Sequence, residues 1–531
     1  MPLPASQDRP RRTAQPQRSH PLELRSALPP ARPADRTRGL PRLHRPQPPR
    51  PGRRPLRRQP LAPVVARRPR RARRSAGPRL QPLVARRRSL RIGTPPLAGE
   101  MNSEAELLES ARRFSFGGRM DKSGTGPIFV RGSGSEVEDT SGKRYLDFNS
   151  GQMCAWLGHN HPAITEAVRD ACDVLIHSHS SYYNDKEIEL AERLGNLLPD
   201  PLQKSMFLQS GADANEAAIN IARKYTGGFE IVSPHASFHG MSDTTRSLTF
   251  AGWHRGYGPP QPGMMAMLAP YCYRCPINLE PETCDLACLD ASFELIDAQT
   301  TSRPAAVLTE PIFSAGGVIE PPSGWLAELK RRCEDRGMLL VLDEEQTGLG
   351  KTGDTFAFEQ DGVVPDIMTL AKHFGGGICI SSVSTSAEIE EQVVAEEFIV
   401  THSHSNDPLA CAAGTATLNV LEYEDLAGRA RRLGGHLKSK LNEIAERFEI
   451  VGDVRGRGLL QGIELVRNRR TKEPATTEGK AIAERCLHEG LIFSVRREGS
   501  VLRFVPPAST TEAQIDLAMD ILAIALGEAR G

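Results

Sequence analysis

One stretch, MLLVLDEEQTGLGKTGDTFAFEQDGVVPDIMTLAKHFGGG from Met338 to Gly377, decides the fold of this chain. An apolar run, Leu339 to Leu342, has the length of a buried strand and leads directly to Asp343. After a loop rich in Gly and Thr, a second apolar run, Ile367 to Ala371, leads to Lys372. The pattern predicts two parallel-type strands, each of which presents one charged side chain at its end.

A carboxylate and a lysine at two such strand ends form the arrangement that a pyridoxal 5′-phosphate (PLP) enzyme needs. The amine of Lys372 would bind the aldehyde carbon of the cofactor. The carboxylate of Asp343 would pair with the protonated pyridine nitrogen and keep the ring electron-poor. The alternative interpretation is a surface lysine and a helix-capping aspartate in an unrelated α/β protein.

The same stretch resembles the class III aminotransferases, whose signature is close to D-E-x-Q-T-G-x-G-R-T-G, then P-D-I, then a lysine before glycines. Asp343, Gln346 and Thr347 fit this signature, and Lys351 stands at the position of the usual Arg. The resemblance extends from Met101 to the C-terminus and implies an α/β fold of PLP fold type I. Such a fold has a large domain, with a mostly parallel sheet covered by helices, and a smaller α+β C-terminal domain.

The order of the segments agrees with that expectation. Strands alternate with helices between about residues 200 and 390, which predicts a mostly parallel sheet with ligands beyond the carboxyl ends of its strands. We therefore expect an N-terminal segment over 101–155, a large PLP-binding domain over 156–410 and a small C-terminal domain over 411–531.

The net charge of +2 hides two opposite regions. Residues 1–100 contain 26 Arg, no Lys and 4 acidic residues, whereas the remainder contains 41 Lys and Arg against 61 Asp and Glu. The Arg- and Pro-rich leader has too few apolar residues to fold. It is a basic arm that binds nucleic acid or acidic surfaces, a transit peptide, or an upstream frame read in error before a true start at Met101. The change in composition just before Met101 favours the last interpretation.

The acidic body is typical of a soluble enzyme, for which we expect neither nucleic acid nor a membrane as partner. No apolar run has the length of a membrane span. The ten cysteines are scattered, which favours a reduced, cytoplasmic compartment. Four of them are close enough in sequence to suggest a zinc site, although plain thiols are favoured: Cys272, Cys275, Cys284 and Cys288.

A phosphate site is expected at a turn before a helix. Ser210, Gly211 and Ala212 precede the predicted helix Ala214 to Lys224, and free N–H groups at a helix start bind phosphate. The common alternative is an ordinary capped helix. Glu310 near the end of the predicted strand Ala305 to Ile312 is expected at the same edge.

The resemblance implies roles for several further residues. Phe238, before His239, would stack on the pyridine ring, and Gln346 would contact the ring oxygen. Arg503 would bind the substrate carboxylate. Ser403 would reach the phosphate in a partner subunit, which implies a homodimer or a dimer of dimers with shared active sites.

Within this family the chain is similar to 2,2-dialkylglycine decarboxylase around Gln152, at Met241 and at Arg503. There Gln152 would contact the carboxylate that leaves, and potassium would bind near Ser180, Ser403 and Asp407. Two differences affect the choice of substrate. Phe238 replaces a Trp, and Ala315 replaces a Ser that would touch the substrate carboxylate.

We therefore expect a PLP-dependent aminotransferase that moves an amino group from an amino acid or amine to a 2-keto acid. Lys372, Asp343 and Gln152 are the expected catalytic residues, with Lys372 as general acid and base. One alternative is transamination that depends on decarboxylation. An alternative of another class is a binding or regulatory protein that acts through the basic N-terminal arm.

Overall fold

The computed structural model describes residues 103–116, 126–252 and 255–529. The chain divides into two units, Met1–Pro95 and Pro96–Gly531, and every described residue belongs to the second unit. The Arg- and Pro-rich leader, with the interpretations given for it, lies outside the described residues. None of the helices in the described ranges is long and apolar enough to cross a membrane.

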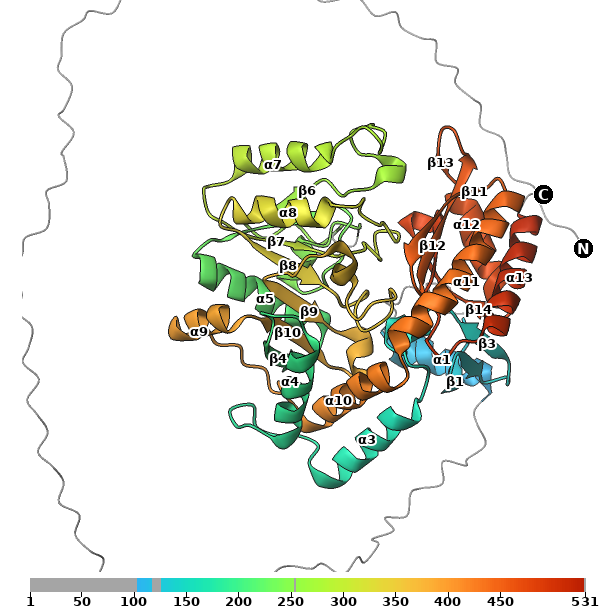
Figure 1. Ribbon diagram of the computed structural model, residues 1–531. Coiled ribbons are helices and arrows are strands. Elements are labelled where there is room, and N and C mark those ends of the chain that lie inside the picture. Colours follow the sequence, from blue (N-terminus) through green and yellow to red (C-terminus); the bar gives the residue numbers. More distant parts are fainter. Residues whose placement is uncertain (1–102, 117–125, 253–254, 530–531) are drawn as a thin grey trace, which may run out of the picture. The chain divides into compact units, whose positions relative to one another are not determined.

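A seven-stranded sheet with the order β4-β10-β9-β8-β7-β5-β6 lies at the centre of the large domain (Figure 1). The strands from β9 to β6 are parallel to their neighbours, whereas β10 is antiparallel to both β9 and β4. The mostly parallel sheet expected from the sequence is confirmed. Its strands are β4 Lys204–Leu208, β5 Glu230–Pro234, β6 Met264–Met267, β7 Pro304–Thr309, β8 Leu339–Asp343, β9 Ile367–Leu370 and β10 Ser381–Thr385.

Strand β8 explains why helices cover both faces of this sheet. All five of its residues are buried, and successive side chains of a strand point to opposite faces. Leu340 belongs to one core cluster with Phe293 of α7, whereas Val341 belongs to another with Ile219 of α5. The surrounding helices are α3 Pro162–Val174, α4 Asp185–Leu197, α5 Gly211–Thr226, α6 Asp243–Ser247, α7 Ala287–Gln299, α8 Trp325–Glu334, α9 Ala387–Ala395 and α10 Pro408–Tyr423.

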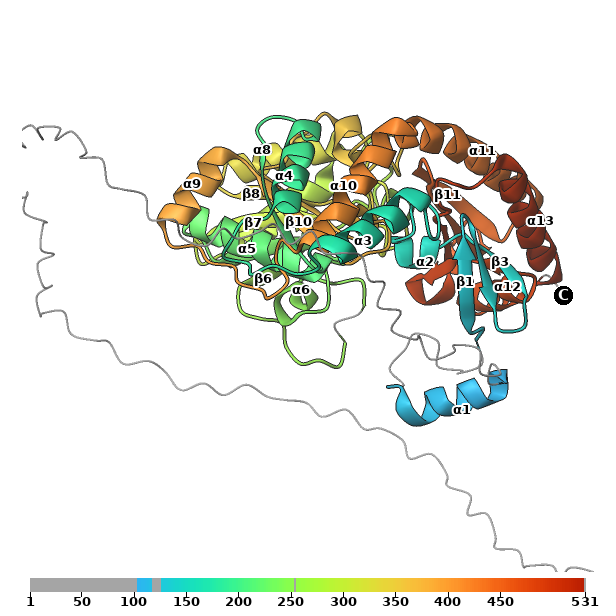
Figure 2. The ribbon, with the colours of Figure 1, turned by 90° about the horizontal axis from the view of Figure 1, so that it is seen from below.

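A second sheet lies in the C-terminal part of the chain, with the order β11-β12-β16-β15 and with β13 paired to β12. Helices α11 and α13 contact each other, and α11 packs on β11 (Figure 2). The elements are α11 Leu426–Arg447, β11 Val451–Arg457, β12 Leu460–Asn468, β13 Glu473–Pro474, α12 Thr476–His488, β15 Ser494–Arg496, β16 Val501–Phe504 and α13 Glu512–Glu528.

A third sheet joins the N-terminal segment to the C-terminal part. The two-residue strand β14, Leu491–Ile492, pairs in parallel with β3, and β3 pairs with β2 and β2 with β1. The sequence analysis predicted neither α12 nor β14. For β14 the reason is that a two-residue strand has no readable periodicity. The domain boundaries stay a prediction. The remaining elements are α1 Glu104–Phe114, β1 Phe129–Ser133, β2 Glu136–Asp139, β3 Arg144–Asp147 and α2 Ser150–Met153.

Two neighbouring glycines of α11 allow a matched test of its packing. A Cβ on Gly434 would lie 2.2 Å from the carbonyl oxygen of Gly458, whereas a Cβ on Gly435 would meet no atom within 4 Å. We expect Gly434→Ala to destabilise the protein by about 1–3 kcal/mol, because the helix must move away from the β11–β12 turn. Gly435→Ala should stabilise it by about 0.5–1 kcal/mol through helix propensity. Urea unfolding of both variants measures the difference, and equal shifts would contradict this packing.

Candidate active site

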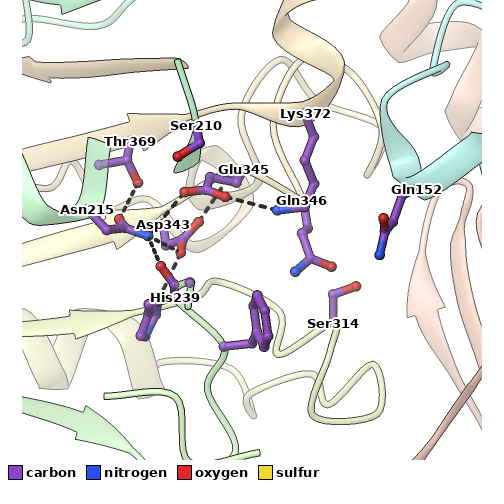
Figure 3. A network of polar contacts seen from close by, with 12 residues as sticks. Gln152, Ser210, Asn215, His239, Ser314, Asp343, Glu345, Gln346, Thr369 and Lys372 are labelled. Carbon is purple, nitrogen blue, oxygen red and sulfur yellow. Dashed lines mark hydrogen bonds and ion pairs between the residues drawn. The ribbon is translucent and has the colours of Figure 1, made fainter. Parts of the chain in front are cut away.

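Four strands of the central sheet bring polar and charged side chains to one edge. Ser210 follows β4, Glu310 follows β7, Asp343 ends β8 and Lys372 follows β9. These four strands run in the same direction, so the edge is formed by their carboxyl ends. Figure 3 shows Ser210, Asp343 and Lys372 around one space.

Asp343 is buried and surrounded by donors. Its Oδ2 lies 2.8 Å from His239 Nδ1 and 2.9 Å from Asn215 Nδ2, and its Oδ1 accepts from the backbone N–H of Glu345 at 3.1 Å. Burial alone would raise the pKa of Asp343. The hydrogen bond and charge of His239, the charge of Lys372 and the bond from Asn215 outweigh burial and lower it. The carboxylate therefore stays ionised and can face a cation.

Asn215, on the buried face of α5, connects the site and was not identified from the sequence. Its amide nitrogen contacts Asp343, the carbonyl oxygen of His239 at 2.9 Å and Glu345 Oε1 at 3.1 Å. Its Oδ1 accepts from the Thr369 hydroxyl at 2.9 Å. The available signal was one of two amides in a predicted helix that is rich in alanine and isoleucine.

Lys372 forms an ion pair with a residue that was also not identified. Its Nζ donates to Glu345 Oε2 at 2.9 Å (Figure 3). Burial lowers the pKa of Lys372, but the charges of Glu345 and Asp343 raise it by more, so the net pKa is raised. The lysine backbone lies in the left-handed region with a φ of 48°, directly after the extended residue Ala371. Without a cofactor, Lys372 is thus an ammonium group between carboxylates.

Glu310 holds the backbone of two neighbouring loops. Its carboxyl group accepts from the N–H of Phe238 at 2.9 Å and from the N–H of Ser314 at 3.2 Å. Burial and the nearby charge of Asp343 raise its pKa well above the usual range. A neutral Glu310 therefore positions the half-buried Phe238 without adding a negative charge beside Asp343.

The first turn of α5 is a candidate anion site, although the Glu345 carboxylate lies against Gly211 there. Ser210 caps the helix through the Asp213 N–H and donates its own hydroxyl to the Asp213 carboxylate at 2.7 Å. Gly211 and Ala212 are the first residues of a helix of 16 residues, where backbone N–H groups have no partner within the helix. Such a terminus favours phosphate.

Arg503 of β16 is fully buried and lies beside the same edge. Its Nη1 donates to the Ser314 hydroxyl at 2.9 Å and to Gln346 Oε1 at 3.0 Å, and its Nε donates to Ser494. Its Nη2 is buried and has no hydrogen-bond partner among the described residues. Burial and the charge of Arg496 lower its pKa. This guanidinium can therefore receive an added carboxylate.

Gln152 faces the same space from the N-terminal segment. It follows Gly151, whose φ is 66°, and Figure 3 shows it opposite Gln346. Met241 is more peripheral, with 40% of its surface exposed. Ala315 lines a cavity of about 900 Å³ together with Arg496 and other cationic residues.

Of the residues expected near potassium, Asp407 has other partners. The Oδ1 of Asp407 lies 2.6 Å from His177 Nδ1, and its Oδ2 lies 2.5 Å from His404 Nδ1. These three side chains form a group of potential metal ligands, but imidazole is a poor ligand for a hard cation. Ser180 is half-buried and Ser403 is exposed. Potassium stays a prediction.

The four clustered cysteines are free thiols. They lie near enough to influence one another, because Cys275 and Cys284 both raise the pKa of Cys272. Within the described ranges they do not meet the ligand spacing of a metal site. Whether they are plain thiols or hold a metal ion stays a prediction.

Comparison with known proteins decides the family. The family model described as "Aminotransferase class-III" matches residues 121–526. The chain belongs to the class III aminotransferases. An uncharacterized aminotransferase of Schizosaccharomyces pombe is 40% identical over 75% of this chain and 90% of its own length. A leucine/methionine racemase of Thermococcus litoralis is 34% identical over 76% of this chain and 90% of its own length.

Solved structures agree with this membership. An amine transaminase from an uncultivated Pseudomonas species, in its PLP-bound form, has a TM-score of 0.74 and 28% identity, over 78% of this chain and 98% of its own. The fold is thus that of the PLP-dependent transaminases, and the protein is an enzyme of amino-group transfer. The side chains described above fit PLP, because an ionised Asp343, the amine of Lys372 and the first turn of α5 lie around one space.

Lys351, at the position of the family's usual Arg, provides a test of charge burial near this site. Lys351 is fully buried, and its Nζ lies 3.5 Å from His373 Nδ1. Burial lowers the pKa of Lys351 from 10.5 to about 7. Between those values the unfolded chain binds more protons than the folded one, so Lys351 makes stability rise with pH. We expect Lys351→Met to remove about 1.4 kcal/mol of this rise per pH unit. Urea unfolding of the cofactor-free protein from pH 7 to 10 measures it, and parallel profiles would contradict the assignment.

Proposed function

We propose that this class III aminotransferase transfers the amino group of an amino acid or amine to a 2-keto acid at the carboxyl edge of the central sheet. The observation that carries the proposal is the ionised Asp343, held by His239 and Asn215, beside Lys372. A buried anion maintained by two donors suits a protonated pyridine nitrogen.

PLP, when bound, supplies an electron-poor ring that accepts the negative charge left on a substrate carbon. Asp343 would hold its ring nitrogen, with Phe238 stacked on the ring and Gln346 at the ring oxygen. Ser210, Gly211 and Ala212 would hold its phosphate with Ser403 of the partner subunit. His239 acts by orienting Asp343, and Glu310 by fixing the backbone of Phe238.

Lys372 would hold the cofactor and then act as the general acid and base of the reaction. To accept a proton from the substrate Cα it must be a neutral amine, whereas its surroundings in the cofactor-free protein favour the ammonium form. Release from its carboxylate neighbours is therefore a requirement of the chemistry. Lys372 would deliver the accepted proton on the cofactor side of the site. Water would then release the keto product, and the same steps in reverse with the 2-keto acid would complete the transfer of the amino group.

The substrate carboxylate is assigned to Arg503 and Gln152. The unpartnered Nη2 of Arg503 supports this role, because a carboxylate would satisfy its buried donor. Ser314, which accepts from Arg503 Nη1, fixes the guanidinium plane. Ala315 offers no hydroxyl group to the substrate. The site would therefore prefer amino-donor substrates other than those that a serine at this position would bind.

Three further features belong to the proposal. The protein acts as a homodimer or a dimer of dimers with shared sites, because the family resemblance assigns Ser403 to the phosphate bound in a partner subunit. Its compartment is cytoplasmic, as its free cysteines suggest. A potassium ion near Ser180, Ser403 and Asp407 would support the loop that carries Ser403.

The central experiment uses the purified chain reconstituted with PLP. We expect a visible absorption band that is absent in Lys372→Ala, together with keto product from an amine-donor panel with pyruvate as acceptor. Lys372→Ala should lose at least about 10⁴-fold in rate, because it removes both the covalent anchor and the proton carrier. Absence of the band in the unaltered protein would refute the proposal. Inversion of the amino acid without keto product would indicate racemisation, the activity named for the Thermococcus relative.

Transamination that depends on decarboxylation is the second candidate, supported by Gln152 opposite the space between Lys372 and Gln346 (Figure 3). With 2-aminoisobutyrate and pyruvate, this candidate predicts equal amounts of carbon dioxide and alanine. Because Ala315 lacks a donor, we expect transamination of ordinary amino acids to exceed this reaction by about 10-fold or more. Carbon dioxide formation that equals the best transamination rate would reverse the order of the two candidates.

A further inference from the structure

Glu345 is a buried carboxylate to which the proposed function assigns no role. It occupies the variable position of the D-E-x-Q-T-G motif. A Cβ added to Gly211 would come within 2.1 Å of all three atoms of the Glu345 carboxylate. The carboxylate therefore lies against the first residue of α5, and it pairs there with Lys372 at 2.9 Å (Figure 3).

Charged groups from several elements surround Glu345. Burial raises its pKa, and the charges of Asp343 on β8 and Asp213 on α5 add to this effect. Lys372 lowers the pKa through its charge and hydrogen bond, but the net direction is upward. His239 lies on the far side of Asp343 and keeps that neighbour ionised. The ammonium group of Lys372 is thus the cation that balances Glu345.

The position of Glu345 is fixed by its contacts. Only 6% of its surface is exposed, and its Oε1 accepts from Asn215 Nδ2 at 3.1 Å. Asn215 is itself held by Thr369 and by the His239 carbonyl oxygen. Asn215 thus fixes one carboxylate oxygen beside α5, while Lys372 holds the other.

Cofactor binding changes both sides of this balance. The proposed phosphate position is the start of α5, where the Glu345 carboxylate already lies. A phosphate would add negative charge beside it, and Lys372 would cease to be a free ammonium group once it holds the cofactor. Each change favours the neutral form of a buried carboxyl group.

We propose that Glu345 takes up a proton when PLP enters the site, so that cofactor binding is coupled to protonation of this residue. The inference rests on the proposed function, because it concerns the same PLP site. In the cofactor-free protein Glu345 is the counter-ion of Lys372. In the loaded protein it is a neutral acid, able to donate to a phosphate oxygen.

The direction of the pH effect follows from the proton balance. A ligand that binds together with a proton binds more weakly as pH rises. The effect extends from the pKa of Glu345 in the cofactor-free protein up to its higher pKa in the loaded protein. Within that window the Kd for PLP increases by up to about tenfold per pH unit from this group alone.

The test compares the unaltered protein with Glu345→Gln, which keeps the shape but cannot titrate. Calorimetric titration of cofactor-free protein with PLP, in buffers of different ionisation enthalpy at pH 8, counts the protons taken up. We expect the unaltered protein to take up about one proton more per PLP bound than Glu345→Gln does. The ratio of its Kd to that of Glu345→Gln should rise by up to about tenfold per pH unit.

Glu344→Gln is the matched control. Glu344 is buried at the end of the same strand and has a pKa raised to about 7, but it accepts from Thr347 and the Phe358 N–H rather than from Lys372. Its replacement should leave the proton count unchanged. Equal counts for the unaltered protein and Glu345→Gln would overturn the inference, whereas absence of PLP binding by the unaltered protein would refute the proposed function itself.

A second measurement needs no variant and applies if Glu345→Gln does not fold. The infrared difference spectrum between loaded and cofactor-free protein should contain a new band of a protonated carboxyl group. With PLP shown to be bound by its visible band, a spectrum without that carboxyl band would overturn the inference.

Discussion

The charge on Asp343 is the constraint on which the rest of the site depends. Burial favours the neutral acid, yet the site requires an anion. Asp343 stays ionised because His239, from the loop after β5, and Asn215, from α5, both donate to one of its oxygens. Strand β8, the loop and the helix must therefore dock together, and packing of α5 on the sheet determines the charge available for chemistry.

Burial has opposite results at neighbouring residues, because the partners differ. Glu310 receives only backbone N–H groups and lies near the charge of Asp343, so its pKa is raised. Lys372 lies beside two carboxylates and its pKa is raised, whereas Lys351 has no such neighbour and its pKa is lowered. Burial amplifies each local difference because little water screens it. The site is thus a set of charges balanced against one another.

Membership of the class III aminotransferases establishes the reaction class and leaves the substrate to local chemistry. The matched proteins carry names as different as racemase and amine transaminase, although they share this fold. Discrimination between substrates must therefore come from the few side chains that face the space beyond Lys372. In this chain they include Gln152 and Ser314, next to a guanidinium with one unpartnered nitrogen.

By itself, the sequence determined the two strands that carry the central residues of the site, although it did not predict α12 or β14. Apolar runs of strand length, each followed by a charged residue, were enough to place Asp343 and Lys372 at the carboxyl ends of a mostly parallel sheet. Only the tertiary structure decided that Asn215 holds Asp343 and that Glu345, in a variable position of the motif, pairs with Lys372. The physical reason is that strand and helix periodicity is a local property of the chain. The charge state of a buried group, in contrast, depends on partners that are distant in sequence and meet only when the elements pack.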